Sequence, residues 1–440
     1  MVVGELRRKV GLFGLTAYGV GMILGAGIYA LIGSAAGVAG NSVWLSFLIG
    51  AFVSSFTGLS YAELSSTIPK SAAEYSYAKE AFKGDLAPFL VGWIIIFTET
   101  VSASTVALGF SGYFKGLFGS PMVLTSPILI ALLSLVNFAG IEESSRLNVL
   151  FTIIEASGLL LIVALAIPYF GSVNYLEASQ GLSGILKAST LIFFAYLGFE
   201  DIVNLAEESK SPERSIPKAL ILSVIVTAIF YVLVAMAIVS IADWQELGSS
   251  CCPLAYAASK ALGPNAFLVM SAIALFATSN TVLILLIVTS RMIYGLSRDG
   301  SLPRGLSQIS NRGTPWIAII IVMVASTLVA LLGNIELVAE MTNFGTFITF
   351  ASVNLSAIWL RFRKPEWERP FKTPIAIAKI PLIPLIGLLS CGLMITQFRL
   401  DIIGLSFLVI LAGIAAQRIL RSRQRNSRNE DEDRELHTRD

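Results

Sequence analysis

The feature that most constrains this chain is a succession of apolar stretches separated by short polar segments. Each stretch is close to the length of about 20 residues that a helix needs to cross the hydrocarbon core of a bilayer. Hydrophobic residues make up 55% of the 440 residues and charged residues only 14%, whereas soluble domains typically carry about 25% charged residues. These observations exclude an ordinary soluble enzyme and a nucleic-acid-binding protein. They predict an all-α integral membrane protein embedded in the lipid bilayer.

We expect twelve transmembrane helices, joined by loops too short to hold a soluble domain. The first apolar stretch is longer than the apolar core of a cleavable signal and no polar domain follows it, so we expect it to belong to the mature protein. The predicted helices cover residues 10–38, 42–67, 87–117, 123–140, 146–170, 184–207, 216–241, 265–296, 315–333, 337–360, 380–397 and 402–419.

The basic residues predict the orientation of the chain, because lysine and arginine favour cytoplasmic loops. With the N-terminus in the cytoplasm, all but four of the 31 lysines and arginines lie on the cytoplasmic side. The four exceptions are Lys115, Lys187, Lys260 and Arg399. We therefore expect a multi-pass protein of the cell membrane with both termini in the cytoplasm, as an even number of helices requires.

Two of the predicted helices contain stretches that are poorly suited to a continuous helix. Residues 19–27 hold four glycines, and each glycine weakens a helix by about 1 kcal/mol relative to alanine. In residues 193–201, Gly198 is followed closely by Glu200 and Asp201. Glycines also allow close packing of membrane helices. However, interrupted helices at corresponding positions of two halves are typical of inverted-repeat transporters, whose binding site lies between the repeats.

The predicted organisation follows from this interpretation. Two five-helix repeats come first, and two additional helices and a charged tail, basic and then acidic, follow them. The segments are a cytoplasmic N-terminus at 1–9, the first repeat at 10–170, the second repeat at 184–361, helices eleven and twelve at 380–420, and a disordered cytoplasmic tail at 421–440.

Interrupted helices of this kind predict a site for a zwitterion. The free N–H groups at the start of a half-helix bind an anion, and the free carbonyl groups at the end of the preceding segment bind a cation. An α-amino acid carries both charges. We expect Gly25, Ala26 and Gly27 to bind its carboxylate through N–H groups, and Ile23, Phe194, Ala195 and Leu197 to bind its ammonium group through carbonyl groups. The aromatic rings of Phe194 and Tyr196 suit either a gate over the substrate or ordinary helix packing.

The same stretches carry a resemblance to a known family. Residues 19–29 resemble the first-helix motif of the amino acid–polyamine–organocation superfamily. Further similarity to that superfamily, in the expected order, is found in residues 61–69, 193–200, 206–208, 212–219 and 297–303. The resemblance implies the five-plus-five inverted-repeat fold and amino acid transport by alternating access. The branch that it resembles holds the cationic amino acid transporters.

Carboxylates within membrane spans are costly and are functional by default. Glu63 lies near the end of its span beside Lys70, where an ion pair or a loop cap is the expected role. Glu99 would face the side chain of the substrate, and a carboxylate there suits a cationic side chain. In the cationic branch, however, the resemblance places this glutamate at the position of Thr98. A one-residue offset rotates a helical side chain by about 100°, so specificity stays open.

Four residues are candidates for coupling transport to an ion: Glu155, Glu200, Ser279 and Asn280. Glu155 lies where the resemblance implies a lysine in proton-coupled relatives, and Glu200 lies where it implies a proton-sensing acidic residue. A protonated carboxyl group is neutral, so a carrier can occlude it without burying a charge. Sodium instead prefers hard oxygen ligands, which Ser279, Asn280 and the neighbouring Thr281 would add. Both ions stay open, and we favour the proton. We expect no other cofactor and no metal site.

Other classes of function fit the sequence less well. Histidine commonly serves as the base in hydrolases and acyltransferases, but the one histidine is His437 in the tail, and the three cysteines form no metal motif. We therefore do not expect an enzyme. An ion channel would conduct without a substrate, and a receptor would bind without turnover, whereas a carrier shows saturable counterflow. The identity of the amino acid and the oligomeric state stay open.

Overall fold

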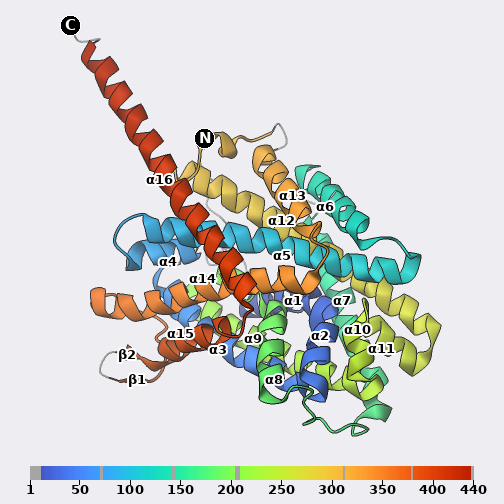
Figure 1. Ribbon diagram of the computed structural model, residues 1–440. Coiled ribbons are helices and arrows are strands. Elements are labelled where there is room, and N and C mark those ends of the chain that lie inside the picture. Colours follow the sequence, from blue (N-terminus) through green and yellow to red (C-terminus); the bar gives the residue numbers. More distant parts are fainter. Residues whose placement is uncertain are drawn as a thin grey trace.

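The computed structural model of the chain describes residues 11–69, 73–139, 144–203, 209–310, 313–377 and 380–437 (Figure 1). Side chains are described in these ranges except at 139, 144–151 and 423–437. The predicted N-terminal segment 1–9, Lys70, and residues 206–208 of the similarity to the superfamily therefore lie outside the described residues.

The described part of the chain is almost entirely helical. Its α-helices are α1 (Leu12–Ile23), α2 (Ala26–Ala39), α3 (Val43–Thr67), α4 (Ala73–Ala81), α5 (Leu86–Phe118), α6 (Met122–Ala139), α7 (Ser144–Ala166), α8 (Gly181–Ile192), α9 (Pro212–Ile241), α10 (Trp244–Ser249), α11 (Pro253–Leu262), α12 (Pro264–Arg298), α13 (Trp316–Ala330), α14 (Ile335–Arg363), α15 (Leu382–Ile395) and α16 (Leu400–His437). Short 3-10 turns are η1 (Gly40–Ser42), η2 (Ile167–Tyr169), η3 (Phe193–Tyr196) and η5 (Arg304–Ser307), and β1 (Ala376–Ile377) pairs antiparallel with β2 (Ile380–Pro381).

Most predicted helices agree with the observed ones to within a few residues. The first predicted helix is divided into α1 and α2, and the sixth ends as a regular helix at Ile192. Three short helices, α4, α10 and α11, were not predicted, because none carries an apolar stretch long enough to cross a bilayer. Helical backbone continues to His437, past residue 421 where we expected a disordered tail, since arginine, glutamine and glutamate all favour helices.

The surface of the helix bundle suits a lipid environment. Among the described residues, seven helical stretches are long and apolar enough to cross a membrane, and α1, α6, α13 and α15 are shorter apolar helices. Large apolar side chains lie exposed on the outer helices, for example Leu135 of α6 (65%), Leu328 of α13 (62%) and Leu408 of α16 (60%). Apolar exposure on this scale would destabilise a soluble protein, whereas lipid satisfies it. The chain is a multi-pass membrane protein.

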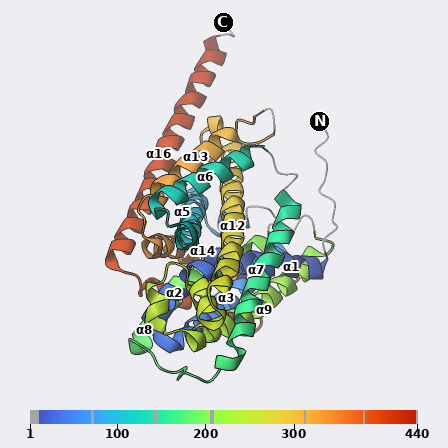
Figure 2. The same cartoon turned by 90° about the vertical axis from the view of Figure 1, so that its right-hand side faces the viewer.

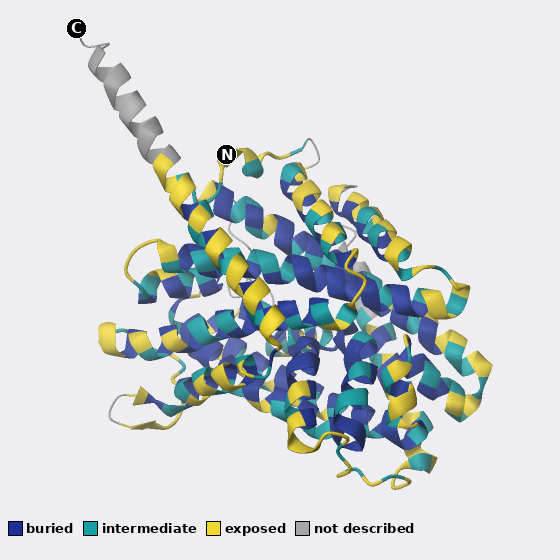
Figure 3. Cartoon of the chain, in the orientation of Figure 1, coloured by how far each residue is buried: buried dark blue, intermediate teal, exposed yellow. Residues whose placement is uncertain are grey.

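The centre of the molecule is built around α5. This helix is buried along most of its length and packs against α12 and α14 (Figure 3). Two views at right angles show α12 passing beside both α5 and α7 (Figures 1 and 2). Helix α3 packs on α9 and also reaches the interrupted segment after α8. A Cβ atom on Gly50 of α3 would lie 2.9 Å from the ring of Tyr196, so this surface fits closely against η3.

Candidate functional site

The first interruption lies between α1 and α2. Helix α1 ends at Ile23, and the N–H of Leu24 makes its last helical hydrogen bond, to the carbonyl of Val20 at 2.8 Å. Gly25 then adopts a non-helical backbone (φ −46°, ψ −172°) before Ala26, the first residue of α2, and no side chain caps the new helix. The predicted break near residues 23–27 is therefore confirmed.

The second interruption follows α8. The chain tightens into η3 at Phe193–Tyr196, and Leu197 is then fully extended. Gly198 adopts a φ of +109°, a conformation that residues with a Cβ atom rarely adopt. The N–H of Gly198 donates a hydrogen bond to the carboxylate of Glu200 at 3.0 Å. The predicted break near residues 194–199 is confirmed as well.

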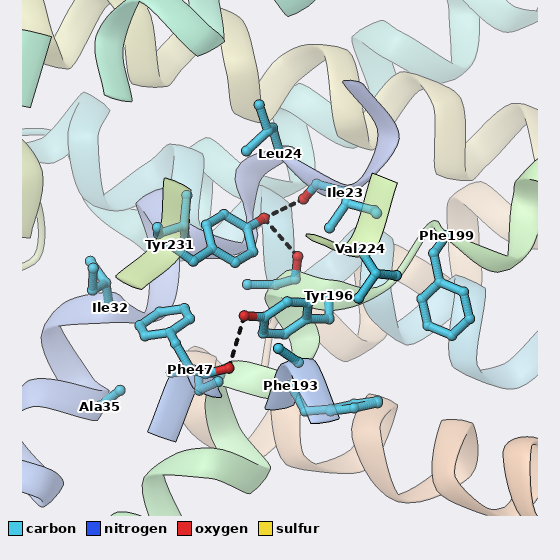
Figure 4. Close-up of a cluster of buried hydrophobic side chains, with 14 of the residues drawn as sticks. Ile23, Leu24, Ile32, Ala35, Phe47, Phe193, Tyr196, Phe199, Val224 and Tyr231 are labelled. Atoms are coloured by element: carbon cyan, nitrogen blue, oxygen red, sulfur yellow. Dashed lines mark hydrogen bonds between the residues drawn. The ribbon is translucent and has the colours of Figure 1, made fainter. Parts of the chain in front are cut away.

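The two interruptions lie against each other. A Cβ atom on Gly27 would lie only 2.6 Å from the Cα atom of Ala195, and one on Gly198 would lie 3.1 Å from the carbonyl oxygen of Met22. The hydroxyl of Tyr231, from α9, lies within hydrogen-bonding distance of two carbonyl oxygens, those of Ile23 and Ala195 (Figure 4). One side chain therefore links both breaks.

A cavity lies where the breaks meet, and it collects nearly all of the predicted site residues. Its walls include Gly21, Met22, Ile23, Gly25, Ala26, Gly27, Glu99, Ser102, Glu155, Phe194, Ala195, Leu197, Gly198, Glu200, Asp201, Asn280, Thr281, Ile284 and Leu285. These residues come from both interruptions and from α5, α7 and α12. Peptide groups and carboxylates therefore share the cavity with apolar side chains, as in many small-molecule sites.

Ser279 is the predicted site residue that does not line this cavity; Thr281, two positions further along α12, does. Two positions on a helix correspond to a rotation of about 200°, so these two hydroxyl groups lie on different sides of α12. The N–H of Ala26 donates to Oγ1 of Thr281 at 3.3 Å. One of the three N–H groups predicted to bind a carboxylate thus already has a partner in α12.

Glu155 is the most completely enclosed of the cavity's carboxylates. Its side chain is 1% exposed, and its Oε1 atom has no hydrogen-bond partner among the described residues. Its backbone carbonyl accepts a hydrogen bond from the hydroxyl of Tyr29 at 2.6 Å. This bond holds α7 to α2, so Glu155 is fixed in position beside the first interruption.

Glu99, Glu200 and Asp201 lie together on one side of the cavity and also line a second cavity, which reaches Glu74 of α4. The hydroxyl of Tyr61 donates to Glu74 at 3.0 Å. Burial raises the pKa of the Glu74 carboxyl group above its usual value. The two cavities share these three carboxylates, and the second cavity extends the acidic lining toward α4.

Thr98 and Glu99 differ in what they reach. Both line the second cavity, but only Glu99 also lines the first. A Cβ atom on Gly345 of α14 would lie 2.3 Å from Thr98 Cγ2, so Thr98 packs closely against α14. In this chain the acidic position therefore faces the interruptions, despite the offset of one residue that the resemblance implies.

Glu63 has the structural role that we expected, but its partner is Arg361 of α14. The Arg361 guanidinium donates to both carboxylate oxygens, at 2.8 and 2.5 Å, and the N–H and hydroxyl of Thr373 donate to Oε2 at 2.8 and 2.9 Å. Lys70, the partner suggested by sequence proximity, lies outside the described residues. The buried pair joins the end of α3 to α14 and to the segment that follows it.

The short helices α10 and α11 lie on the side of the molecule away from α4 (Figure 1). These helices pack against α2, and a Cβ atom on Gly33 of α2 would lie 2.6 Å from the carbonyl oxygen of Leu247. We call α10, α11 and the link between them the lid.

The hydroxyl of Tyr196 donates to the carbonyl of Phe47 at 2.8 Å, which holds η3 to α3 (Figure 4).

Sequence reasoning missed Tyr231. This residue lies in an apolar helix with no nearby motif, so its sequence context is that of a packing residue, and nothing in the sequence could have identified it. Of the three oxygen ligands that the sequence offered in α12, Asn280 and Thr281 line the cavity.

Comparisons with known proteins identify the family of the chain. The sequence pattern of the amino acid permease family matches residues 10–415. A branched-chain amino acid permease, BcaP, of Bacillus subtilis is 30% identical over 411 residues, covering 88% of this chain and 87% of the relative. The methylthioribose transporter of the same bacterium is 27% identical over 434 residues, covering 93% and 92%.

A further relative comes from an animal. Cationic amino acid transporter 4 of Mus musculus is 28% identical over 389 residues, which cover 82% of this chain and 61% of the relative. The proteins that the chain matches are thus permeases and transporters, not enzymes. With a family match that covers nearly its whole length, the chain belongs to the amino acid permease family of the amino acid–polyamine–organocation superfamily.

Proposed function

We propose that this protein is a secondary active transporter that moves an α-amino acid across the cell membrane by alternating access and couples that movement to protons. The observation that carries the proposal is the meeting of two interrupted helices at a cavity lined by their peptide groups. Such a pair of breaks offers N–H groups to a carboxylate and carbonyl groups to an ammonium group within one small space.

The proposed architecture is twelve spans in a five-plus-five inverted repeat. The first repeat comprises α1 with α2, then α3, α5, α6 and α7. The second comprises α8 with the interrupted segment after it, then α9, α12, α13 and α14, and α15 and α16 follow. The support for this arrangement is that the broken element is the first in each half. The distribution of basic residues supports cytoplasmic termini, which would place α4 inside and the lid outside.

In the proposed binding mode, the carboxylate of the substrate lies at the start of α2, near Gly25 and Gly27. The N-terminal end of a helix carries partial positive charge, and neither glycine has a side chain to keep the carboxylate away. The ammonium group lies near the carbonyl groups of Ile23 and Ala195, where Tyr231 holds the two breaks in register. Phe194 and Leu197 complete the wall.

The substrate's side chain would point toward α5, where Glu99 lies. The relatives differ in the substrate that their names give: one is described as a permease for branched-chain amino acids and another as a cationic amino acid transporter. Apolar residues such as Ile284 and Leu285 suit a neutral side chain, and Glu99 suits a cationic one. The charge state of Glu99 in the bound complex is therefore the determinant of specificity in this proposal.

A binding screen and a transport assay test the proposal together. Ligands that bind the native state raise its unfolding temperature by mass action, so we expect a subset of the amino acids to do so with the purified protein. Those amino acids should then show saturable counterflow in proteoliposomes. Conductance without substrate would instead identify a channel, and binding without counterflow would identify a receptor.

A pair of glycine variants tests the site itself. Gly27→Ala places a Cβ atom 2.6 Å from the backbone of Ala195 and should abolish both the thermal shift and counterflow. Gly295→Ala in α12, where a Cβ atom would meet no heavy atom within 4 Å, is the matched control and should retain both. Full transport by Gly27→Ala would rule out the contact between the breaks as the binding site.

A further inference from the structure

The lid carries a pair of neighbouring thiols that the proposed transport cycle does not use. Cys251 is exposed and Cys252 is buried, in the link between α10 and α11. A hydrogen bond joins their sulfur atoms at 3.5 Å. The two sulfur atoms therefore already face each other, although the residues are adjacent in the chain.

The link that holds these thiols is wedged between two helices. Cys252 lies against α5, where a Cβ atom on Gly116 would approach its sulfur atom to 3.0 Å. Pro253, the first residue of α11, lies against α2, where a Cβ atom on Gly33 would approach its Cβ atom to 2.8 Å. A change in the backbone at residues 251 and 252 must therefore be transmitted to α5 and α2.

The two sulfur atoms differ in reactivity. The hydrogen bond from Cys252 and the positive charge of Lys115 lower the pKa of the Cys251 thiol below its usual value, against the opposing effect of partial burial. The thiolate is the form that attacks disulfides, and Cys251 is also the one that solvent reaches. The hydrogen bond with Cys251 and burial raise the pKa of the Cys252 thiol. This thiol is buried but lies within reach of Cys251.

We propose that Cys251 and Cys252 form a reactive dithiol on the lid, which small-molecule disulfides convert into a disulfide between the two neighbours. The Cys251 thiolate attacks one sulfur of the small disulfide, which forms a mixed disulfide and releases one thiolate. Cys252 then loses its proton to solvent and attacks the Cys251 sulfur, which releases the second thiolate. The protein loses two hydrogen atoms, and the small disulfide is reduced to two thiols.

The geometry predicts that this disulfide is easily reversed and changes the lid. Adjacent Cα atoms across a trans peptide are about 3.8 Å apart, whereas disulfides usually join Cα atoms about 4.4–6.8 Å apart. The bond therefore forms with a backbone shift, and strained, exposed disulfides are the labile ones. Because that shift reaches α2, oxidation should slow transport; this consequence rests on the proposed function, whereas the dithiol chemistry does not.

Mass spectrometry of the intact, full-length protein tests the chemistry. The protein is treated with oxidised glutathione, denatured, and alkylated with N-ethylmaleimide. The wild type should lose two hydrogen atoms, carry no glutathione, and be alkylated at Cys391 alone. Cys252→Ser should stop at a glutathione adduct on Cys251. Cys251→Ser should react with no glutathione, because its remaining thiols are buried.

Two results would overturn the dithiol. One is a wild type that keeps all of its thiols free under conditions in which Cys252→Ser is modified. The other is a glutathione adduct that persists in the wild type, since Cys252 would then not reach Cys251.

Counterflow measured on the same samples tests the link to the lid. We expect oxidised wild type to be several-fold slower, to recover with dithiothreitol, and both serine variants to be unaffected. A disulfide that forms without slowing counterflow would overturn that link. A protein that transports nothing in either redox state would instead count against the proposed function. The mass spectrometry would still show whether the disulfide between Cys251 and Cys252 forms.

Discussion

Two buried carboxylates, Glu63 at the end of α3 and Glu155 in the middle of α7, are almost equally hidden from solvent, at 2% and 1% exposure. Around Glu63, Arg361 and Thr373 donate four hydrogen bonds to the carboxylate. Around Glu155, one carboxylate oxygen has no partner among the described residues and the side chain faces the cavity. The difference shows that burial alone does not separate these two carboxylates; the completeness of their hydrogen bonding, together with a position on the cavity, does.

The largest effect should come from breaking the satisfied pair. Glu63→Gln leaves the Arg361 guanidinium buried without a counter-charge, and removing one partner of a buried pair costs about 3–5 kcal/mol. We expect a large drop in the unfolding temperature of the purified protein. Glu80→Gln is the control, because its ion pair with Lys364 is partly exposed and such pairs contribute at most about 1 kcal/mol. Equal shifts in the two variants would show that Glu63 is not a structural carboxylate.

A variant at Glu99 tests whether this third carboxylate has a functional role, as we propose for Glu155. If Glu99 binds a cationic side chain, Glu99→Gln should weaken lysine binding by about 2 kcal/mol or more, since truncating a desolvated charge pair costs that much. Leucine and alanine binding should change far less. Thermal-shift titrations of the three amino acids measure the difference. Equal losses for all three amino acids would show that Glu99, like Glu63, has a structural role and does not determine specificity.

A smaller effect is expected from the hydroxyl of Tyr231, a neutral group that bonds to backbone carbonyls of the site. Tyr231→Phe leaves the carbonyl groups of Ile23 and Ala195 without their shared partner, and an unsatisfied buried group costs about 1–3 kcal/mol. We expect substrate affinity to fall by about tenfold, at about 1.4 kcal/mol per factor of ten. Tyr175→Phe is the control, because that hydroxyl bonds Ser240 and Gly171, away from the breaks. Equal affinities in both variants would exclude a positioning role for Tyr231.

The two interruptions could be predicted because their cause is local. Four glycines in residues 19–27, and Gly198 before two carboxylates, weaken the helix wherever the rest of the chain lies. The peptide groups that line the cavity followed from those breaks. The apolar stretches likewise fixed most helix ends to within a few residues, because lipid imposes their length.

The remaining features depend on contacts between distant segments. Arg361 lies 298 positions from Glu63, so sequence proximity suggested Lys70 instead. The sequence offered Ser279, Asn280 and Thr281 together, because the rotation of α12, which decides which of them line the cavity, depends on packing that no local pattern specifies. Tyr231 contributes through a hydroxyl aimed at two backbone carbonyls, and α4, α10 and α11 are too short to leave an apolar signature.

The most direct test of the account is the response of transport to a proton gradient in proteoliposomes without sodium. We predict that an inward gradient drives uphill uptake by the wild type, and that Glu155→Gln retains exchange but loses the response to the gradient. Glu340→Gln is the matched control: Glu340 of α14 also has a carboxylate oxygen without a partner among the described residues, but it does not line the cavity. Its response should be intact. Uptake that requires sodium and ignores the proton gradient, or a Glu155→Gln variant that still responds to protons, would contradict the account.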